Sequence, residues 1–154
     1  MRRRWKYWPE LIVVLLFSTC IGAIAIPNVA NALNRKKQNQ TMADIRTVST
    51  ALEARATDFN EYPVVRSLDE LAPLVEPTYV KQMPRFDGWH KPFRYESWRE
   101  TGQAAATHYA FSGAGSDGRF EKPSARDYDP SATTTFERDI VFSNGAFIQY
   151  AEGS

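Results

Sequence analysis

Cysteine and histidine are scarce in this chain, and their scarcity excludes several kinds of site. Cys20 is the only cysteine among the 154 residues, so no intrachain disulfide can form. The two histidines, His90 and His108, have no neighbours with the spacing of metal ligands. A Walker motif, an H-E-x-x-H pair and a G-x-S-x-G turn are also absent from the sequence. We therefore expect a protein that is not an enzyme.

A dinucleotide site is excluded by what surrounds the glycines. Gly113, Gly115 and Gly118 match the spacing G-x-G-x-x-G of dinucleotide-binding loops. In those loops the glycines follow a strand and open a helix, whereas Pro123 and Pro130 follow here without apolar periodicity. The match is therefore a coincidence of spacing.

One long apolar run stands near the N-terminus. Residues 11–26 carry no charge, and with the flanking residues 8–10 they come close to the roughly 20 residues that cross a bilayer. Helix-compatible sequence continues after Ala25, which favours an uncleaved anchor over a removed signal peptide. We therefore expect a transmembrane helix over residues 8–27. The short basic leader, residues 1–7, places the N-terminus in the cytoplasm and the rest of the chain across the membrane.

Helical periodicity continues beyond the apolar run. Apolar residues recur there at steps of three, four or seven: Met42, Ile45, Val48, Leu52 and Phe59. Residues 28–60 therefore form an amphipathic continuation of the helix, which needs a partner surface. Pro27 lies inside this long helix and is expected to kink it.

Charge is divided unevenly along the chain. Residues 1–60 contain nine Lys and Arg against four Asp and Glu, hence a net charge of +5. Residues 61–154 contain ten against fourteen, hence −4. The acidic half is therefore the candidate globular domain, and basic residues gather where the membrane and its exit helix are expected. This distribution argues against a nucleic-acid partner.

Residues 61–154 contain a short helix followed by a small sheet. Ser67 and Glu70 form a capping pattern at the start of SLDELAPL. Four segments predict strands: FRYESW, THYAFS, DIVFS and AFIQY. Asn144 and Gly145 join the last two strands as a hairpin. We predict an α+β fold in which the long helix packs on a small antiparallel sheet.

A polar loop, residues 113–138, separates the second and third predicted strands. Loops of this length are usually functional or disordered. Asp117, Asp127, Asp129 and Asp139 would supply oxygen ligands for calcium if the loop folds back on itself. A solvated acidic loop is the alternative.

In this order, these features resemble those of the type IV pilins and pseudopilins, and most closely the major pseudopilin of type II secretion systems. Glu10 and Pro27 stand seventeen residues apart, as the fifth-position glutamate and the proline of that family do. The further matches are Pro27-Asn28, the helix end at Tyr62-Pro63, the turn DGWHKPFRY and the last hairpin DIVFSNGAFIQY.

The resemblance implies a pilin-like fold and a structural role. The chain would be a subunit of a type II secretion-like pseudopilus, a scaffold for protein export that assembles through its N-terminal helix. Its partners would be copies of itself, other pseudopilins, the inner-membrane assembly platform and membrane lipid. It would cross the bacterial inner membrane once, with residues 61–154 in the periplasm.

Assembly residues are implied by the same resemblance. In the family, the glutamate at the position of Glu10 pairs with the N-terminal amine of a neighbouring subunit, and Pro27 matches the proline of the family's helix. Trp5 stands where the prepilin peptidase uses a glycine, so the leader motif is absent. We hypothesise that Lys6, four residues before Glu10, supplies the positive charge. An anchored, non-polymerising pilin-like module is the alternative, and a type IV pilin is a third possibility.

A calcium site in the polar loop is the last implication of the resemblance. Ser112, Asp117 and Asp139 match the positions of the family's ligands, and Glu137 is a weaker match. We therefore expect calcium as the cofactor and these four residues as its ligands.

Overall fold

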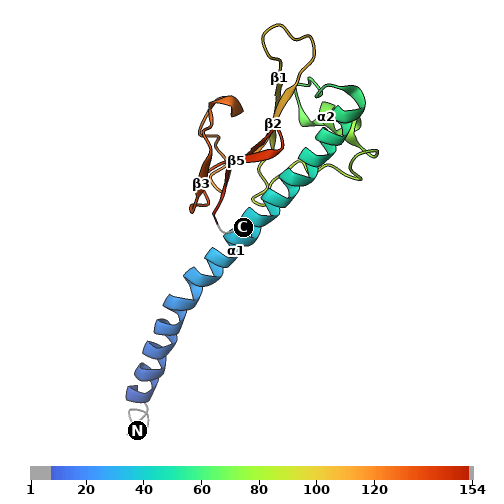
Figure 1. The fold of residues 1–154 in the computed structure, drawn as a ribbon. Coiled ribbons are helices and arrows are strands. Elements are labelled where there is room, and N and C mark those ends of the chain that lie inside the picture. The colour runs from blue at the N-terminus through green and yellow to red at the C-terminus, as the bar shows by residue number, and fades with distance from the viewer. Residues whose placement is uncertain (1–7, 153–154) are drawn as a thin grey trace. The chain divides into compact units, whose positions relative to one another are not determined.

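The computed structural model describes residues 8–152, except for the side chains of Pro9 and of residues 18–27. The chain forms two compact units, Met1–Arg35 and Lys36–Ser154, and each is described by itself. The elements, labelled in Figure 1, are α1 (Trp8–Phe59), α2 (Leu68–Val75), β1 (Arg94–Trp98), β2 (His108–Gly113), η2 (Ala125–Asp127), β3 (Ser131–Thr133), β4 (Ile140–Ser143) and β5 (Ala146–Ala151).

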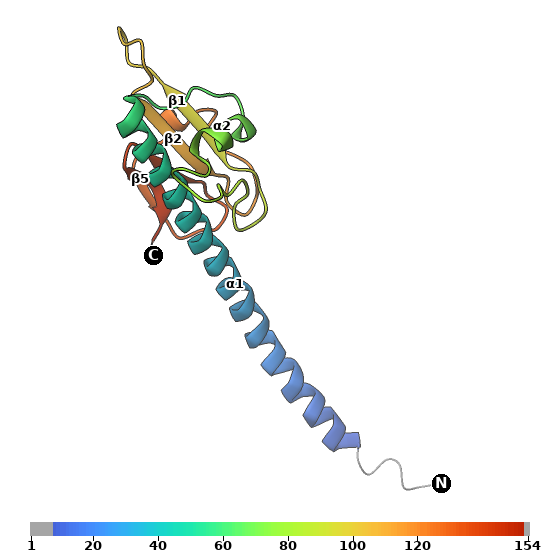
Figure 2. The ribbon, with the colours of Figure 1, turned by 90° about the vertical axis from the view of Figure 1, so that its right-hand side faces the viewer.

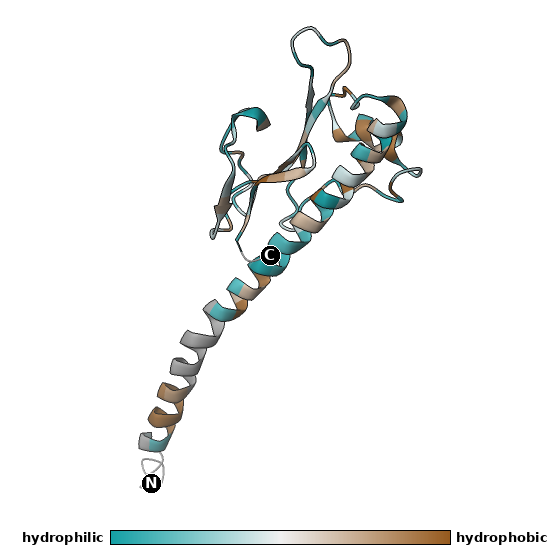
Figure 3. Cartoon of the chain, in the orientation of Figure 1, coloured by the Kyte–Doolittle hydropathy of each residue, from teal (hydrophilic) through white to brown (hydrophobic). Residues whose placement is uncertain are grey.

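The first turns of α1 present apolar side chains to their surroundings. Every side chain of residues 11–17 is apolar and 53–70% exposed, and these turns are brown in Figure 3. In the part of the chain that the structure describes, no helix is long and apolar enough to cross a membrane. The predicted span over residues 8–27 includes residues 18–27, whose side chains lie outside the described ones.

The second half of α1 buries most of its predicted apolar stripe. Four of the five residues are buried: Met42, Ile45, Val48 and Leu52. They belong to one core with residues of the sheet and of α2. Figure 2 shows strands β2 and β5 behind α1. Phe59 departs from the prediction, because it is the last residue of α1 and is 58% exposed, with the Arg55 guanidinium 4.5 Å from its ring centroid. Asn60 ends the helix in the left-handed conformation, at a φ of 56°.

The predicted cap begins α2. Ser67 Oγ accepts a hydrogen bond from the Glu70 N–H at 3.2 Å, and the Glu70 carboxylate accepts one from the Arg66 N–H at 2.9 Å. The first bond satisfies a backbone N–H that the first helical turn leaves without a partner, and the second holds the residue just before the cap. Leu71 and Val75 are fully buried, so one face of α2 joins the same core as α1.

Over the described residues, the strands form a five-stranded sheet in the order β1-β2-β4-β5-β3. All neighbouring pairs are antiparallel except β3 and β5, which are parallel. Asn144 and Gly145 turn β4 into β5 with φ values of 48° and 89°, as a two-residue hairpin loop requires. The four predicted strands are confirmed. The fifth strand, β3, is not predicted, because its three residues lie inside the polar loop.

One face of the sheet is covered by α1 and the other by the polar loop. Successive residues of a strand point to opposite faces. In β2, Tyr109 and Phe111 therefore join the core of α1, whereas Ala110 packs with Ala125 and Tyr128 of the loop. The polar loop is thus a packed layer of the fold.

Candidate functional site

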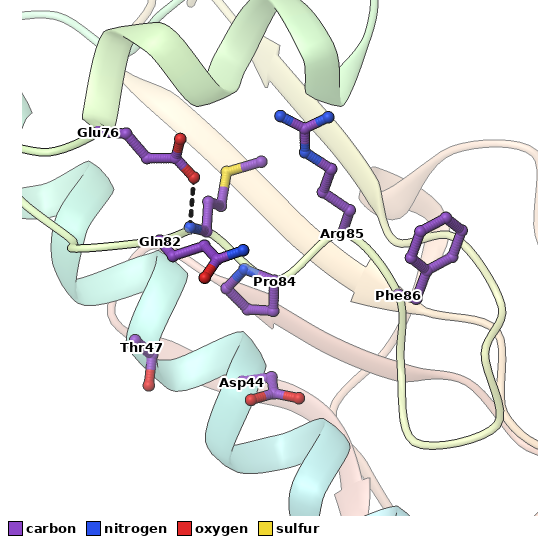
Figure 4. Close-up of a pocket in the computed structure, with 8 residues that line it drawn as sticks. Asp44, Thr47, Glu76, Gln82, Pro84, Arg85 and Phe86 are labelled. Atoms are coloured by element: carbon purple, nitrogen blue, oxygen red, sulfur yellow. Dashed lines mark hydrogen bonds between the residues drawn. The ribbon is translucent and has the colours of Figure 1, made fainter.

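A cavity of about 530 Å³ lies between α1 and the segment that links α2 to β1. Asp44 and Thr47 line it from α1, and Glu76 and residues 82–86 line it from the linking segment (Figure 4). We call this cavity the acidic groove.

Two polar contacts hold the linking segment in place. Glu76 Oε1 accepts a hydrogen bond from the Met83 N–H at 2.5 Å, drawn as a dashed line in Figure 4. The Met83 side chain is buried in the core. Arg85 Nη1 lies 2.5 Å from Asp69 Oδ1 at the start of α2, in an ion pair that is open to solvent. The charge of Arg85 is therefore already paired.

Asp87 closes the turn that follows the groove. Its Oδ1 accepts hydrogen bonds from the N–H groups of Trp89 and Lys91, both at 2.8 Å. Burial of Asp87 raises the pKa of its carboxyl above the ordinary range. His90 is exposed and adopts a left-handed φ of 62°, a conformation that glycine reaches with less strain.

Gly88 docks this turn against α1. Its N–H donates a hydrogen bond to Thr41 Oγ1 at 2.9 Å. A Cβ at Gly88 would lie 2.3 Å from the backbone oxygen of Lys37, so only glycine fits without movement of the backbone. The spacing between α1 and the segment that lines the groove is therefore set by backbone contact.

An unpaired carboxylate gives the groove its charge. Burial raises the pKa of Asp44 above the ordinary range, and its carboxylate has no hydrogen bond or ion pair with any residue that the structure describes. Glu76 adds a second acid to the lining, and the side chain of Phe86, which also lines the groove, is 58% exposed. A second cavity of about 280 Å³ shares Arg85 and Phe86 with the groove. The arrangement suits a positively charged group.

The predicted calcium ligands lie on two segments that the structure brings side by side. Gly113 of β2 pairs with Ile140 of β4, and the Ser116 N–H donates to the Phe136 carbonyl oxygen at 2.8 Å. The four predicted ligands differ in burial: Ser112 and Asp139 are buried, and Asp117 and Glu137 are exposed. Asp117 Oδ1 accepts a hydrogen bond from the Arg119 N–H at 3.0 Å, within its own turn.

Asp139 has a structural role in the polar loop. Its Oδ2 accepts hydrogen bonds from the Glu121 N–H at 2.9 Å and from the Tyr128 hydroxyl. Its Oδ1 is buried without a partner among the described residues, and burial raises the pKa of the carboxyl. Across residues 8–152, with the side chains noted above left out, no group of three or more His, Cys, Asp and Glu could hold a metal ion. Calcium binding here stays a prediction.

The predicted assembly residues lie in the first unit. Glu10 is exposed in the first turn of α1. Lys6 lies outside the described residues, and so does the side chain of Pro27, which stands within α1. The pairing of Glu10 with Lys6 also stays a prediction.

Sequence reasoning missed the acidic groove. Its acids come from α1 and from the residue that follows α2, and no motif joins such distant positions. The available signal was the D-x-W turn at Asp87, which indicates a docked loop but not what the loop encloses. Comparison of the chain with models of protein families, with curated proteins and with solved structures gave no match.

Proposed function

We propose that this chain is a structural subunit of a type II secretion-like pseudopilus, anchored in the bacterial inner membrane with residues 61–154 in the periplasm. One observation carries the proposal. A single helix, α1, begins with exposed apolar turns and continues into a half that packs on a small sheet. Contiguous exposed apolar surface has to be covered by lipid or by neighbouring helices. A helix of this kind both anchors a subunit and assembles it.

Two features support assembly over a purely anchoring role. Glu10 is an acid among apolar residues, and an acid close to the hydrocarbon costs a few kcal/mol unless a positive partner lies nearby. A neighbouring subunit would supply that partner. The sequence spacing from Glu10 to Pro27 supports the same role.

A membrane-anchored module that does not polymerise is the second candidate. Trp5, in place of the peptidase's glycine, favours it, because without cleavage before Lys6 the chain has no α-amine close to Glu10. In such a module the groove and the sheet would bind other assembly proteins.

The test uses the full chain, expressed in a bacterium that carries a type II secretion system. Membranes are washed at alkaline pH and treated with an amine-reactive cross-linker. We expect the chain to stay in the membrane fraction and to form a ladder beyond the dimer. Glu10→Gln should weaken the ladder without releasing the chain, whereas Glu61→Gln, at an exposed position of the second unit, should leave it intact.

Three results would change the proposal. Release of the chain by the alkaline wash would contradict the anchor. Membrane-bound monomers alone would favour the non-polymerising module. The intact mass adds a further distinction, because loss of residues 1–5 would show processing, and a full-length mass would leave Lys6 as the partner of Glu10.

A further inference from the structure

We propose that the acidic groove receives the basic segment Arg35-Lys36-Lys37 of a second copy of this chain. The inference deepens the proposed function and rests on it, because the two copies must stand parallel in one membrane. In the filament, this contact would hold the second unit of one copy to its neighbour.

Charge complementarity identifies the occupant. The groove offers Asp44, whose carboxylate has no partner among the described residues, together with Glu76. Arg85 does not neutralise these acids, because it pairs with Asp69.

The basic segment, which every copy of this chain carries, has the opposite charge. Residues 35–37 are three consecutive cations, and Arg35 and Lys36 are exposed. Within the described part of the chain, none of the three side chains forms an ion pair. The exposed ring of Phe86 also offers a face on which a guanidinium can stack.

Helix geometry keeps Lys36 away from Asp44 of its own chain and sets the shift that a contact between two copies requires. Eight residues separate Lys36 from Asp44, which is about 12 Å along a helix. A parallel neighbour shifted by about that distance along the helix brings its own Lys36 level with Asp44.

Such a contact does not close on itself. Each copy uses its groove toward one neighbour and its basic segment toward the other. Because the two surfaces differ, the contact is head-to-tail and generates an open filament. A two-fold dimer of parallel helices would place Lys36 opposite Lys36 and would bury like charges.

Site-directed cross-linking in membranes tests this pairing. The background is Cys20→Ala, which removes the single natural thiol. Lys36→Cys and Asp44→Cys are introduced together and treated with a short bis-maleimide. We expect a ladder beyond the dimer, because each chain joins two neighbours. Either cysteine alone should give dimers at most.

Charge exchange supplies the second measurement. Asp44→Lys should reduce the ladder formed by the amine-reactive reagent by more than about tenfold, as expected when a partly buried charge pair is replaced by repulsion. Adding Lys36→Asp to this variant should restore the ladder. Glu61→Lys, an equal charge change away from the groove, should have no effect.

The possible outcomes distinguish failure of the proposed contact from failure of the proposed function. In one outcome, the Cys20→Ala chain forms ladders with the amine reagent, but the cysteine pair does not cross-link and Asp44→Lys assembles normally. The proposed contact is then wrong, and the proposal that the chain is a filament subunit stands. If the chain forms no multimer in membranes, both are overturned. A ladder from the cysteine pair, with loss and recovery on charge exchange, establishes the contact.

Discussion

The two faces of the sheet are covered in different ways. On one face, α1 packs apolar side chains such as Leu52 against Tyr109 and Phe111. On the other face, the polar loop adds only a small apolar cluster around Ala125 and Tyr128. An apolar stripe can be recognised from its period along the chain, whereas a layer held mainly by individual polar contacts cannot.

Polar contacts from β1, at one edge of the sheet, and from Asp139, just before β4, hold the loop. The Arg94 guanidinium donates to the carbonyl of Lys122 at 3.1 Å and lies 3.9 Å from the ring centroid of Phe120. Glu96 Oε2 accepts from the Ser124 hydroxyl at 2.9 Å. Asp139 adds its two bonds from the other side. Because these contacts are few, the loop should open without unfolding of the helix-covered face.

Leu52→Ala should have the largest effect on stability. Leu52 is fully buried against the sheet, and truncation leaves a cavity in the core. We expect a loss of about 2–5 kcal/mol in the free energy of unfolding, measured by chemical denaturation. Leu74→Ala is the matched control, because Leu74 is 39% exposed on α2. Equal losses for the two variants would contradict the assigned core.

Tyr128→Phe should loosen the loop-covered face. The hydroxyl donates to Asp139 and accepts from the Lys122 N–H at 3.0 Å, and its removal leaves both groups short of a partner. We expect a loss of about 1.5–3 kcal/mol, the range for hydrogen bonds to charged groups. Hydrogen exchange should rise in residues 121–139 first. A uniform rise over α1 as well would show that the two layers unfold together.

Gly88→Ala should separate the turn from α1. The added Cβ meets the backbone of Lys37, and the clash should cost about 1–3 kcal/mol, measured as a lower denaturation midpoint. Gly102→Ala is the control, because no atom lies within 4 Å of a Cβ at Gly102. That variant should lose only the smaller strain of a left-handed φ. A larger loss at Gly102 would refute the packing argument.

His90→Gly should stabilise the second unit. His90 holds a left-handed φ of 62° and is exposed, so glycine relieves strain without removing packing. The greater freedom of glycine in the unfolded chain offsets part of the gain, which leaves about 0.5–1 kcal/mol. Thermal unfolding measures it. An unchanged or lower midpoint would mean that the imidazole contributes a contact.

Asp44→Asn should produce the smallest change in stability, with a characteristic pH dependence. Burial raises the pKa of Asp44 in the folded chain, so the folded state binds this proton more tightly than the unfolded state. The contribution of Asp44 to stability therefore falls as pH rises from the ordinary aspartate pKa through the raised one.

Melting temperatures measured at several pH values test this dependence. Asp44→Asn should raise the melting temperature slightly at neutral pH, and the difference should disappear below the ordinary aspartate pKa. Glu61→Gln, at an exposed position, serves as the control. A variant that is less stable at neutral pH would show that Asp44 has a favourable partner within its own chain.

Local patterns predict most of the regular structure. The cap at Ser67 and the hairpin at Asn144-Gly145 depend on bonds and φ values of neighbouring residues, so their chemistry is visible in the sequence. The exposed Phe59 shows the limit of the apolar period, because a period does not tell where the partner surface ends.

The sequence by itself determined the amphipathic helix, the cap of α2, the four strands and their hairpin, because each depends on residues close together in the chain. Only the tertiary structure decided the packed loop with its buried Asp139, the parallel strand β3 and the acidic groove. These features join residues that are far apart in the chain, such as Asp44 and Glu76. Their energies come from burial and from hydrogen bonds that exist only after the helix, the turn at Gly88 and the sheet have packed together.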